Sequence, residues 1–213
     1  MLPQANAEVD RLMADASRMA VPLTAGQATG LLALLDHLAE WNNRVNLTAI
    51  RDRGEMILKH LLDSLSVAPY VSGPTAIDVG TGAGFPGLPL AVVRPDVHFV
   101  LIDGTAKKLA FVSHAATVLG LANVEVVHVR AEDYRPAEKA NVVLSRALGS
   151  LALFAERAGH LVAPGGELLA MKGRLPSDEI AALKGGWHVQ EAPRLTIPGL
   201  DQERHLVRLA RGR

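Results

Sequence analysis

The sequence predicts an α/β fold in which a mostly parallel sheet is covered by helices on both faces. Two observations predict it: short apolar runs alternate with helical stretches from residue 75 onward, and a glycine-rich turn follows the first run. Such alternation is typical of a doubly wound sheet, which binds its ligand beyond the carboxyl ends of its strands. The expected strands are 75–79, 97–103, 124–129, 141–145 and 166–172, and the expected helices between them are 87–94, 106–120 and 150–163.

The first seventy residues are predicted to be helical. Apolar residues recur at helical spacing over 9–20. Thr24 and Gln27 then form a capping-box pattern, which predicts the start of a second helix. A second capping pattern, formed by Asp52 and Glu55, precedes another apolar helical stretch. Strand and helix begin to alternate only after this region.

The C-terminal part predicts an antiparallel pair of strands at one edge of the sheet. Two extended runs, 187–196 and 204–210, are joined by the turn Pro198–Asp201. We therefore expect a helical N-terminal lead-in, residues 1–70, packed on a core of residues 71–213. The two parts together are expected to form one structural domain.

The bulk composition limits the classes of function. The chain has 213 residues, 49% of them hydrophobic, which is ample for one core. Basic and acidic residues number 22 each, so any polyanion must be held by a local patch. The absence of cysteine excludes disulfides, thiolate metal sites and a cysteine nucleophile. With neither a signal-peptide pattern nor an apolar run of membrane-spanning length, we expect a cytoplasmic protein.

The glycine-rich turn carries the densest motif of the chain. Asp78 lies at the end of the first strand, and Gly80, Gly82 and Gly84 alternate after it. Glycine reaches backbone angles that other residues avoid and lets main-chain N–H groups approach a ligand. An acid followed by G-x-G-x-G resembles the first motif of S-adenosylmethionine-dependent methyltransferases. However, Gly82, Gly84 and Gly87 also satisfy the dinucleotide fingerprint, so the turn alone leaves both cofactors open. The alternative that this is only a tight strand-to-helix turn, with no ligand, also stays open.

The second strand ends at Asp103, about twenty residues after the turn. An acid there can accept hydrogen bonds from both hydroxyls of a ribose, which favours an adenosine ligand of either class. The alternative is a helix cap, a role that Thr105 could also fill. Tyr134 is followed four residues later by Glu138, not by the lysine of a short-chain dehydrogenase, and too little chain remains for a separate substrate domain. A nicotinamide-dependent oxidoreductase is therefore the less favoured alternative.

The residues after the third and fourth strands indicate the methyl acceptor. Arg130–Asp133 is a polar cluster expected at the adenine edge, although Asp133 also fits a solvated turn. Ser145–Ala147 would face the reacting methyl group, yet no Asn/Asp-Pro-Pro-aromatic motif and no aspartate of a ribose-methylating tetrad comes after the strand. Without cysteine, methylation of cytosine C5 through an adduct is impossible. Guanine N7 fits by elimination, because its lone pair needs no base and catalysis reduces to alignment and desolvation.

Six short motifs stand in a fixed order between Trp41 and the C-terminus. They are Trp41–Thr48, His60–Leu65, Asp78–Gly87, Ser145–Ala147, Met171–Gly173 and Arg204–Val207. Together they resemble the bacterial ribosomal RNA small-subunit methyltransferase G family, also called glucose-inhibited division protein B. The resemblance implies a Rossmann-like class I methyltransferase fold. It also implies methyl transfer from S-adenosylmethionine to guanine N7 in small-subunit (16S) ribosomal RNA.

The motifs and the resemblance together imply a set of site residues. The expected cofactor-binding residues are Asp78, Gly80, Gly82, Gly84, Phe85, Asp103, Gly104, Thr105, Ala131, Glu132 and Arg146. The expected catalytic residues are Arg146, Asn46, His60, Asp63, Ser64 and Lys172, and no metal ligand is expected. Four of these, Asn46, His60, Asp63 and Ser64, lie on the helical lead-in. They would either shape the acceptor pocket or only support the fold.

The expected partner is small-subunit ribosomal RNA, free or in an assembled particle, with no membrane. Phosphates would be held by local cations, for which the candidates are Arg51, Arg53, Lys59, Arg146, Lys172, Arg174, Arg204 and Arg208. Arg146 and Lys172 are favoured because they follow strands on the ligand side. Aromatic residues make up only 4% of the chain, which favours recognition of a folded RNA over stacking along a single strand. The alternative is an RNA-binding protein that keeps the fold without turnover.

Overall fold

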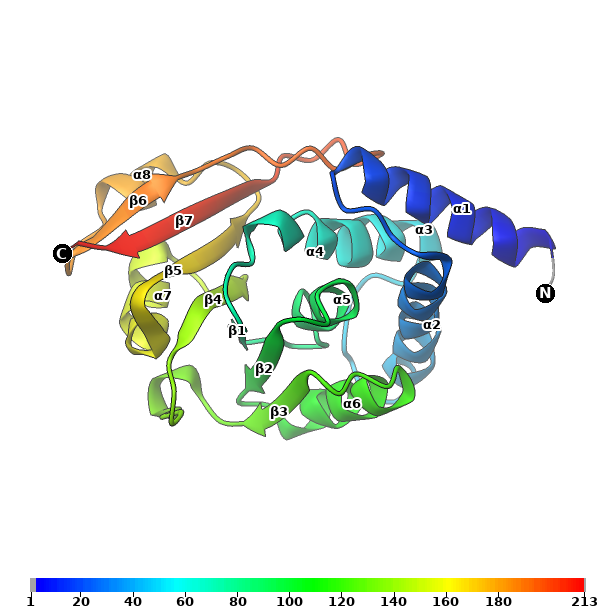
Figure 1. Cartoon of the computed structure of the whole chain (residues 1–213), viewed down its shortest axis with the longest axis horizontal. Helices are drawn as coiled ribbons and strands as arrows, with labels where there is room; N and C mark the ends of the chain where they lie inside the picture. Colours follow the sequence, from blue (N-terminus) through cyan, green and yellow to red (C-terminus); the bar gives the residue numbers. More distant parts are fainter. Residues whose placement is uncertain (1–2, 213) are drawn as a thin grey trace.

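The computed structural model describes residues 3–212, which form one seven-stranded sheet in the order β3-β2-β1-β4-β5-β7-β6 (Figure 1). The strands are β1 Thr75–Val79, β2 His98–Asp103, β3 Val124–His128, β4 Ala140–Arg146, β5 Val162–Lys172, β6 Trp187–Glu191 and β7 His205–Arg211. Strands β1 to β5 are parallel, and β7 runs antiparallel to both β5 and β6. The predicted mostly parallel sheet with an antiparallel C-terminal edge pair is confirmed.

The helices alternate with the strands after the lead-in. They are α1 Pro3–Arg18, α2 Ala25–Asn42, α3 Arg53–Met56, α4 Asp63–Leu65, α5 Gly87–Val93, α6 Ala106–Val118, α7 Leu151–Ala158 and α8 Ser177–Ala181. A π-helical segment, Ile57–Leu62, joins α3 to α4, so one helical run continues from Arg53 to Leu65. Sequence periodicity predicts a helix here but not its π-helical form, and it does not predict the short α8, which has no buried residue to create a pattern.

The predicted helix 150–163 is wrong at its end. Helix α7 stops at Ala158, a 3-10 turn follows, and β5 begins at Val162. Leu161 and Val162 continue the apolar pattern of the helix, but Pro164 lacks an amide hydrogen and Gly165 has a φ of +78°, so neither fits a helix interior.

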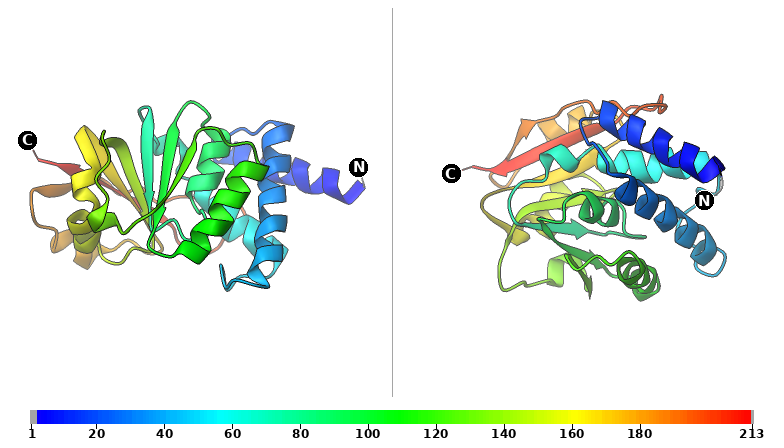
Figure 2. Two further views of the ribbon diagram at one scale, coloured as in Figure 1. Left: turned by 90° about the horizontal axis from the view of Figure 1, so that it is seen from below. Right: turned by 45° about the vertical axis from the view of Figure 1, so that its right-hand side comes forward.

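Two layers of helices cover the sheet, as Figure 2 shows edge-on. Alternate strand residues point to opposite faces, since successive side chains of a strand alternate. Phe99 and Leu101 belong to the apolar cluster shared with the lead-in helices, α5 and α6. Val100 and Ile102 belong to the second cluster, which contains α7 and Trp187.

The lead-in begins its second helix as the sequence predicts. The side chain of Thr24 accepts a hydrogen bond from the amide of Gln27, and Gln27 reaches back to the amide of Thr24, which completes a capping box. Asp52 caps α3 through the amide of Glu55. The division at residue 70 into lead-in and core stays a prediction.

A long connection between β6 and β7 crosses from the sheet edge to the lead-in. Figure 1 shows it along the top of the molecule, reaching α1 before it turns back as β7. Leu195 and Ile197 are buried in the same apolar cluster as the lead-in helices. The connection ends at Arg204, directly before His205 pairs with Lys172 of β5. It therefore returns the chain to the carboxyl end of β5. Within residues 3–212, no helix is both long and apolar enough to cross a membrane.

Candidate functional site

Two hollows lie where the parallel strands end. The first, of about 260 Å³, is lined by Val79, Gly80, Ile102, Asp103, Gly104, Val129, Arg130, Ala131, Glu132, Leu148 and Arg157. The second, of about 430 Å³, is lined by Ile50, Lys59, His60, Asp63, Arg146, Ala147, Met171, Lys172, Gly173 and Arg204. The loop after β4 separates them, because its consecutive residues Ala147 and Leu148 line one hollow each. Ala147 has a φ of +69°, a strained conformation that is concentrated at functional sites.

The glycine turn beside the first hollow is held from below by Asp78. This carboxylate is fully buried, and its Oδ2 accepts hydrogen bonds from the Thr81 hydroxyl at 2.7 Å and from the Gly87 amide at 2.9 Å. Its Oδ1 has no hydrogen-bond partner. Burial raises the pKa of Asp78 to about 6, although both hydrogen bonds act in the opposite direction.

The amides of the turn form hydrogen bonds within the protein and do not face the hollow freely. Gly80, Gly82 and Gly84 have φ values of +67°, +60° and +84°, which only glycine adopts without strain. The Gly80 amide bonds to the carbonyl of Ile102, and the Gly82 amide bonds to Asp103 at 3.0 Å. The expectation that glycine exposes these N–H groups to a ligand is therefore not met.

This arrangement separates the two cofactor classes. A dinucleotide lays its pyrophosphate on free N–H groups at the start of the helix after the turn. Here that helix, α5, begins at Gly87, and the amide of Gly87 is already taken by the carboxylate of Asp78. A buried carboxylate at this position repels a pyrophosphate. An adenosine ligand without phosphate avoids the conflict.

Asp103 forms the floor of the first hollow at the end of β2. Its Oδ1 accepts a hydrogen bond from the Thr105 amide at 2.8 Å, and its Oδ2 accepts the one from Gly82. Each oxygen keeps a lone pair for a ribose hydroxyl. Thr105 occupies the N-cap position of α6 but makes no side-chain cap bond. Ala131 and Glu132 close the hollow from the short 3-10 helix after β3.

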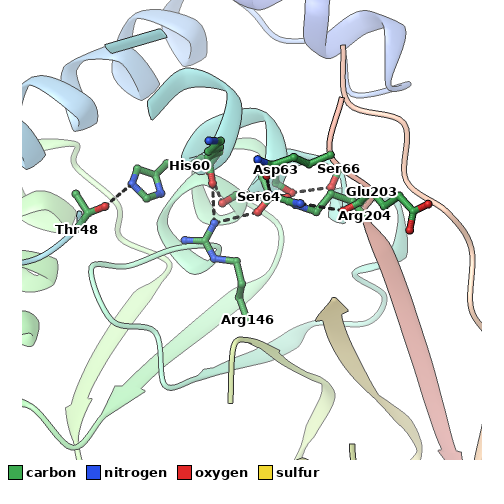
Figure 3. A network of polar contacts seen from close by, with 10 residues as sticks. Thr48, His60, Asp63, Ser64, Ser66, Arg146, Glu203 and Arg204 are labelled. Atoms are coloured by element: carbon green, nitrogen blue, oxygen red, sulfur yellow. Dashed lines mark hydrogen bonds and ion pairs between the residues drawn. The ribbon is translucent and has the colours of Figure 1, made fainter. Parts of the chain in front are cut away.

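The second hollow is built around the carboxylate of Asp63, which is 3% exposed (Figure 3). Its Oδ2 accepts a hydrogen bond from Nη1 of Arg146 at 3.0 Å, and its Oδ1 accepts one from Nε of Arg204 at 2.8 Å. The same Nη1 of Arg146 also donates to the carbonyl of Lys59 at 2.8 Å. The helical run Arg53–Leu65, the end of β4 and the connection before β7 therefore meet at one carboxylate.

His60, which lines the second hollow, stacks on Phe85, and the two rings form an aromatic wall. Their rings stack with centroids 4.8 Å apart, and the guanidinium of Arg146 lies 5.9 Å from the Phe85 centroid. His60 Nε2 is 3.0 Å from the hydroxyl of Thr48, whereas its Nδ1 is buried without a partner. Burial, and then the charge of Arg146, lower the pKa of His60 to about 4, so the ring is neutral near pH 7.

The sequence over residues 27–207 matches the family described as rRNA small subunit methyltransferase G. The chain belongs to this family. Among its named members, ribosomal RNA small subunit methyltransferase G of Nitrosococcus oceani is 47% identical over 90% of this chain and 89% of its own. The Azoarcus member is 48% identical over 89% of both chains.

Solved structures share the fold of this family member. A glycopeptide N-methyltransferase, MtfA, matches 71% of this chain and 87% of its own with a TM-score of 0.61 and 10% identity. A SAM-dependent methyltransferase from Aquifex aeolicus matches 74% of this chain and 93% of its own with a TM-score of 0.56 and 20% identity. MtfA was solved with S-adenosylhomocysteine.

The expected site residues fall into three groups. Gly80, Asp103, Gly104, Ala131 and Glu132 line the first hollow, and His60, Asp63, Arg146 and Lys172 line the second. Gly82 and Thr105 contact Asp103 through their amides, while Asp78, Gly84 and Phe85 shape the turn and the wall. Ser64 and Asn46 belong to neither hollow.

Ser64 and Asn46 have different surroundings. Ser64 is fully buried, and its hydroxyl donates to the carbonyl of His60, a bond that supports the π-helical run. Asn46 is exposed on the loop after α2, and its side chain makes no hydrogen bond within the described residues. That loop is shaped instead by Asn42, whose side chain bonds to the Leu47 and Thr48 amides and to the Thr48 carbonyl.

Three residues of the site were missed or were assigned other roles. Asn42 and Thr48 stand inside the first family motif, but nothing in their spacing indicates that one fixes the loop and the other holds His60. Arg204 was expected only as a phosphate contact, and the structure pairs it with Asp63. Only their place in the family motifs could have pointed to these three residues, because nothing in the neighbouring sequence indicates their roles.

Most of the expected phosphate contacts are already in ion pairs. Arg53 pairs with Glu8 and Asp36, and Arg208 pairs with Glu167 and Glu191. The paired cations also include Lys59, Arg146, Lys172 and Arg204. Of the eight candidates, only Arg51 and Arg174 have no acidic partner within residues 3–212. In the same range, no group of three His, Asp or Glu side chains could hold a metal ion.

Proposed function

We propose that this protein transfers the methyl group of S-adenosylmethionine to N7 of a guanine in small-subunit ribosomal RNA. The observation that carries the proposal is the pair of adjoining hollows at the strand ends of a chain that belongs to the rRNA small subunit methyltransferase G family. One hollow offers groups for an adenosine, and the other offers a basic chamber separated from it by a single loop.

The first hollow fits the methyl donor. The carboxylate of Asp103 would hold the ribose, and the backbone around Ala131 and Glu132 would border the adenine. When bound, S-adenosylmethionine supplies an electrophilic methyl group, which the N7 lone pair attacks while the sulfur leaves as a neutral thioether. The glycine turn, fixed by Asp78 and Asp103, gives the donor a rigid seat.

The second hollow would hold the guanine without acting as a base. N7 carries no proton, so the side chains need only orient the ring and exclude water. Positive charge moves onto the guanine during the reaction. A neutral His60 adds no further positive charge to the hollow, and the carboxylate of Asp63 offsets part of the charge of Arg146 and Arg204. Asp63, itself held by Arg204, would fix Arg146 in the second hollow.

The finer assignments follow from the same proposal. The RNA would be recognised as part of an assembled small-subunit particle, in the cytoplasm, without a metal ion or a membrane. A folded target agrees with the scarcity of aromatic residues, which make up 4% of the chain.

Labelled methyl transfer tests the proposal. The purified protein is incubated with methyl-labelled S-adenosylmethionine and with small ribosomal subunits from cells that lack the enzyme, and protein-free rRNA is tested in parallel. We expect label at one guanine N7 and faster transfer to the particle. Tight donor binding with no transfer to any RNA would contradict the enzyme and favour a binding protein. Tight NADH binding with none for S-adenosylmethionine would overturn the cofactor.

A further inference from the structure

The wall of the second hollow is strongly basic in a chain with no net charge. Four cationic side chains line it, and one carboxylate opposes them; the cations are Lys59, Arg146, Lys172 and Arg204. A cleft lined by one sign of charge focuses the electrostatic field and attracts a polyanion. These four cations are nonetheless engaged inside the protein, with Asp63, Glu55 and Glu179 as their acidic partners. A phosphate contact from any of them requires that an existing ion pair be broken.

Three other arginines border this hollow and have no acidic partner within the described residues. We call Arg51, Arg174 and Arg194 the rim arginines, and all three are exposed. Arg51 follows Ile50 and Arg174 follows Gly173, and both of those neighbours line the hollow.

Arg194 reaches the same rim from the β6–β7 connection. It forms a β-bridge with His205, and Nδ1 of His205 lies 3.2 Å from the carbonyl oxygen of Gly173. The three rim arginines therefore stand on three separate segments of the chain, and each segment is joined to the surroundings of the hollow by hydrogen bonds or a β-bridge.

The rim is held in place although its arginine side chains are exposed. The Ile50 amide, directly before Arg51, donates to the Thr48 hydroxyl at 3.1 Å, and that hydroxyl contacts His60. The Leu195 amide, directly after Arg194, donates to the carbonyl of Arg204 at 2.7 Å. Fixed backbones with free guanidinium groups suit bidentate recognition of phosphate, for which arginine is better shaped than lysine.

The nearby carboxylates do not cancel this charge. Asp63, Glu55 and Glu179 are each paired with a cation of the wall. Glu203 lies beside Arg204, and Figure 3 shows its carboxylate directed away from Arg146 and His60. The rim therefore keeps three positive charges above a wall whose own charges are largely paired.

We infer that the rim arginines bind the RNA phosphates that flank the target guanine, whereas the four cations of the wall hold the site together. The inference rests on the proposed function and adds a division of labour among the cations. It predicts that the rim determines RNA affinity and its salt dependence, while the wall determines the rate of transfer.

The other end of the strands supplies a matched control. Lys139, Lys184 and Arg211 are exposed there and have no acidic partner within the described residues. Lys139 and Arg211 border a larger hollow of about 620 Å³, at the amino end of β5. That hollow is remote from the strand carboxyl ends, where a sheet of this kind binds its ligand. The triple variant K139A/K184A/R211A removes the same charge as R51A/R174A/R194A.

The experiment compares the two triple variants with the wild type. Filter retention measures equilibrium binding to unmethylated small subunits over a series of salt concentrations, and methyl transfer gives KM and kcat. Each lost phosphate contact lowers the slope of log affinity against log salt by roughly 0.7–0.9. We expect the rim triple to lower that slope by about 2–3. It should also raise KM for RNA with kcat and S-adenosylmethionine binding unchanged, and the control triple should match the wild type.

Two outcomes would overturn the inference. An unchanged salt slope in the rim triple would show that these arginines do not contact phosphate. Equal losses in both triples would show that only overall charge matters. Binding is measured without turnover, so a wild type that binds RNA but transfers no methyl group would refute the proposed function and still test the rim.

Discussion

The two sides of the site are built by different means. On the donor side, the glycine turn and the end of β2 are fixed by hydrogen bonds between groups about twenty residues apart, as between Gly82 and Asp103. The acceptor side joins residues far apart in the chain: Arg146 meets Asp63 across 83 positions, and Arg204 meets it across 141. The glycine turn and Asp103 are therefore a local structure, which later residues such as Ala131 and Leu148 complete, whereas the acceptor side exists only after the whole chain has folded.

The largest expected effect comes from removing the residue at the boundary of the two sides. Arg146→Ala removes one partner of the buried Asp63 and the charge beside Phe85. We expect kcat to fall by about 100-fold, because a misplaced reactant can cost that much. Stability should fall by only roughly 1–3 kcal/mol, since Arg204 still pairs with Asp63.

Arg53→Ala is the matched control for Arg146→Ala. Arg53 is also ion-paired, with Glu8 and Asp36, but it lies outside both hollows. Single-turnover kinetics measures the rate of methyl transfer in both variants, and urea unfolding measures their stability. Wild-type turnover in Arg146→Ala would remove this residue from the site, and an equal loss in Arg53→Ala would reduce its role to stability.

The donor side is tested by Asp103→Asn. The substitution keeps the shape but removes the charge that accepts bonds from Gly82 and Thr105 and would hold the ribose. We expect the dissociation constant for S-adenosylmethionine to rise by roughly 10–100-fold, the range for hydrogen bonds to a charged group, with little change in RNA affinity. Calorimetric titration measures it, and the exposed Asp133→Asn serves as control. Equal affinities in the two variants would contradict the assignment of Asp103.

The difference between the donor side and the acceptor side also determines how much of each can be predicted from the sequence. The glycine turn and Asp103 are predictable, because strand, turn and acid are neighbours and their chemistry is local. The direction of the turn's amides is not, because Gly80 and Gly82 donate to Ile102 and Asp103 of β2, and the letters of the motif do not indicate these bonds.

On the acceptor side, His60 and Asp63 are predictable only through family motifs, whereas Arg146 is also predicted by its place at the end of a strand. No spacing rule places Arg204, directly before β7, beside Asp63 of α4, 141 positions earlier in the chain. The pairing of Arg204 with Asp63 and the role of Asn42 require the folded backbone. The sheet itself is predicted well because its strands differ sharply in pattern from the helices around them, except where an apolar pattern runs on from α7 into β5.

His60 and Asp78 should change the stability of the protein in opposite directions as the pH falls. Burial lowers the pKa of His60 from 6.5 to about 4 in the folded protein, so the unfolded chain binds more protons between these values. His60 therefore costs stability as the pH falls from 6.5 towards 4. Asp78 has the opposite sign, since its pKa rises from 3.8 to about 6 and the folded state binds the extra proton.

His60→Gln separates the two contributions. Between pH 7 and pH 5 the variant should lose about 2 kcal/mol less stability than the wild type, from 1.36 kcal/mol per unit of pH below the unfolded pKa. Urea unfolding at the two pH values measures it. Identical changes in both proteins would mean that His60 titrates alike in the folded and unfolded states.

The smallest effects distinguish two asparagines of one motif. Asn42→Ala removes three hydrogen bonds that shape the loop before Thr48 and should cost roughly 1–3 kcal/mol. Asn46→Ala, on an exposed side chain, should change stability by less than about 0.5 kcal/mol. Thermal unfolding of both variants tests this. A large loss of stability in Asn46→Ala would show a structural role, whereas lost activity at full stability would place it against the RNA.

Mapping N7-methylguanine in small-subunit rRNA from cells tests the central claim most directly. Chemical cleavage at N7-methylguanine is compared in cells with the protein, in cells without it, and in cells that carry Arg146→Ala. We predict one cleavage position that disappears without the protein, returns with the wild-type chain and stays absent with the variant. An unchanged cleavage pattern in cells without the protein would contradict the proposed methyl transfer.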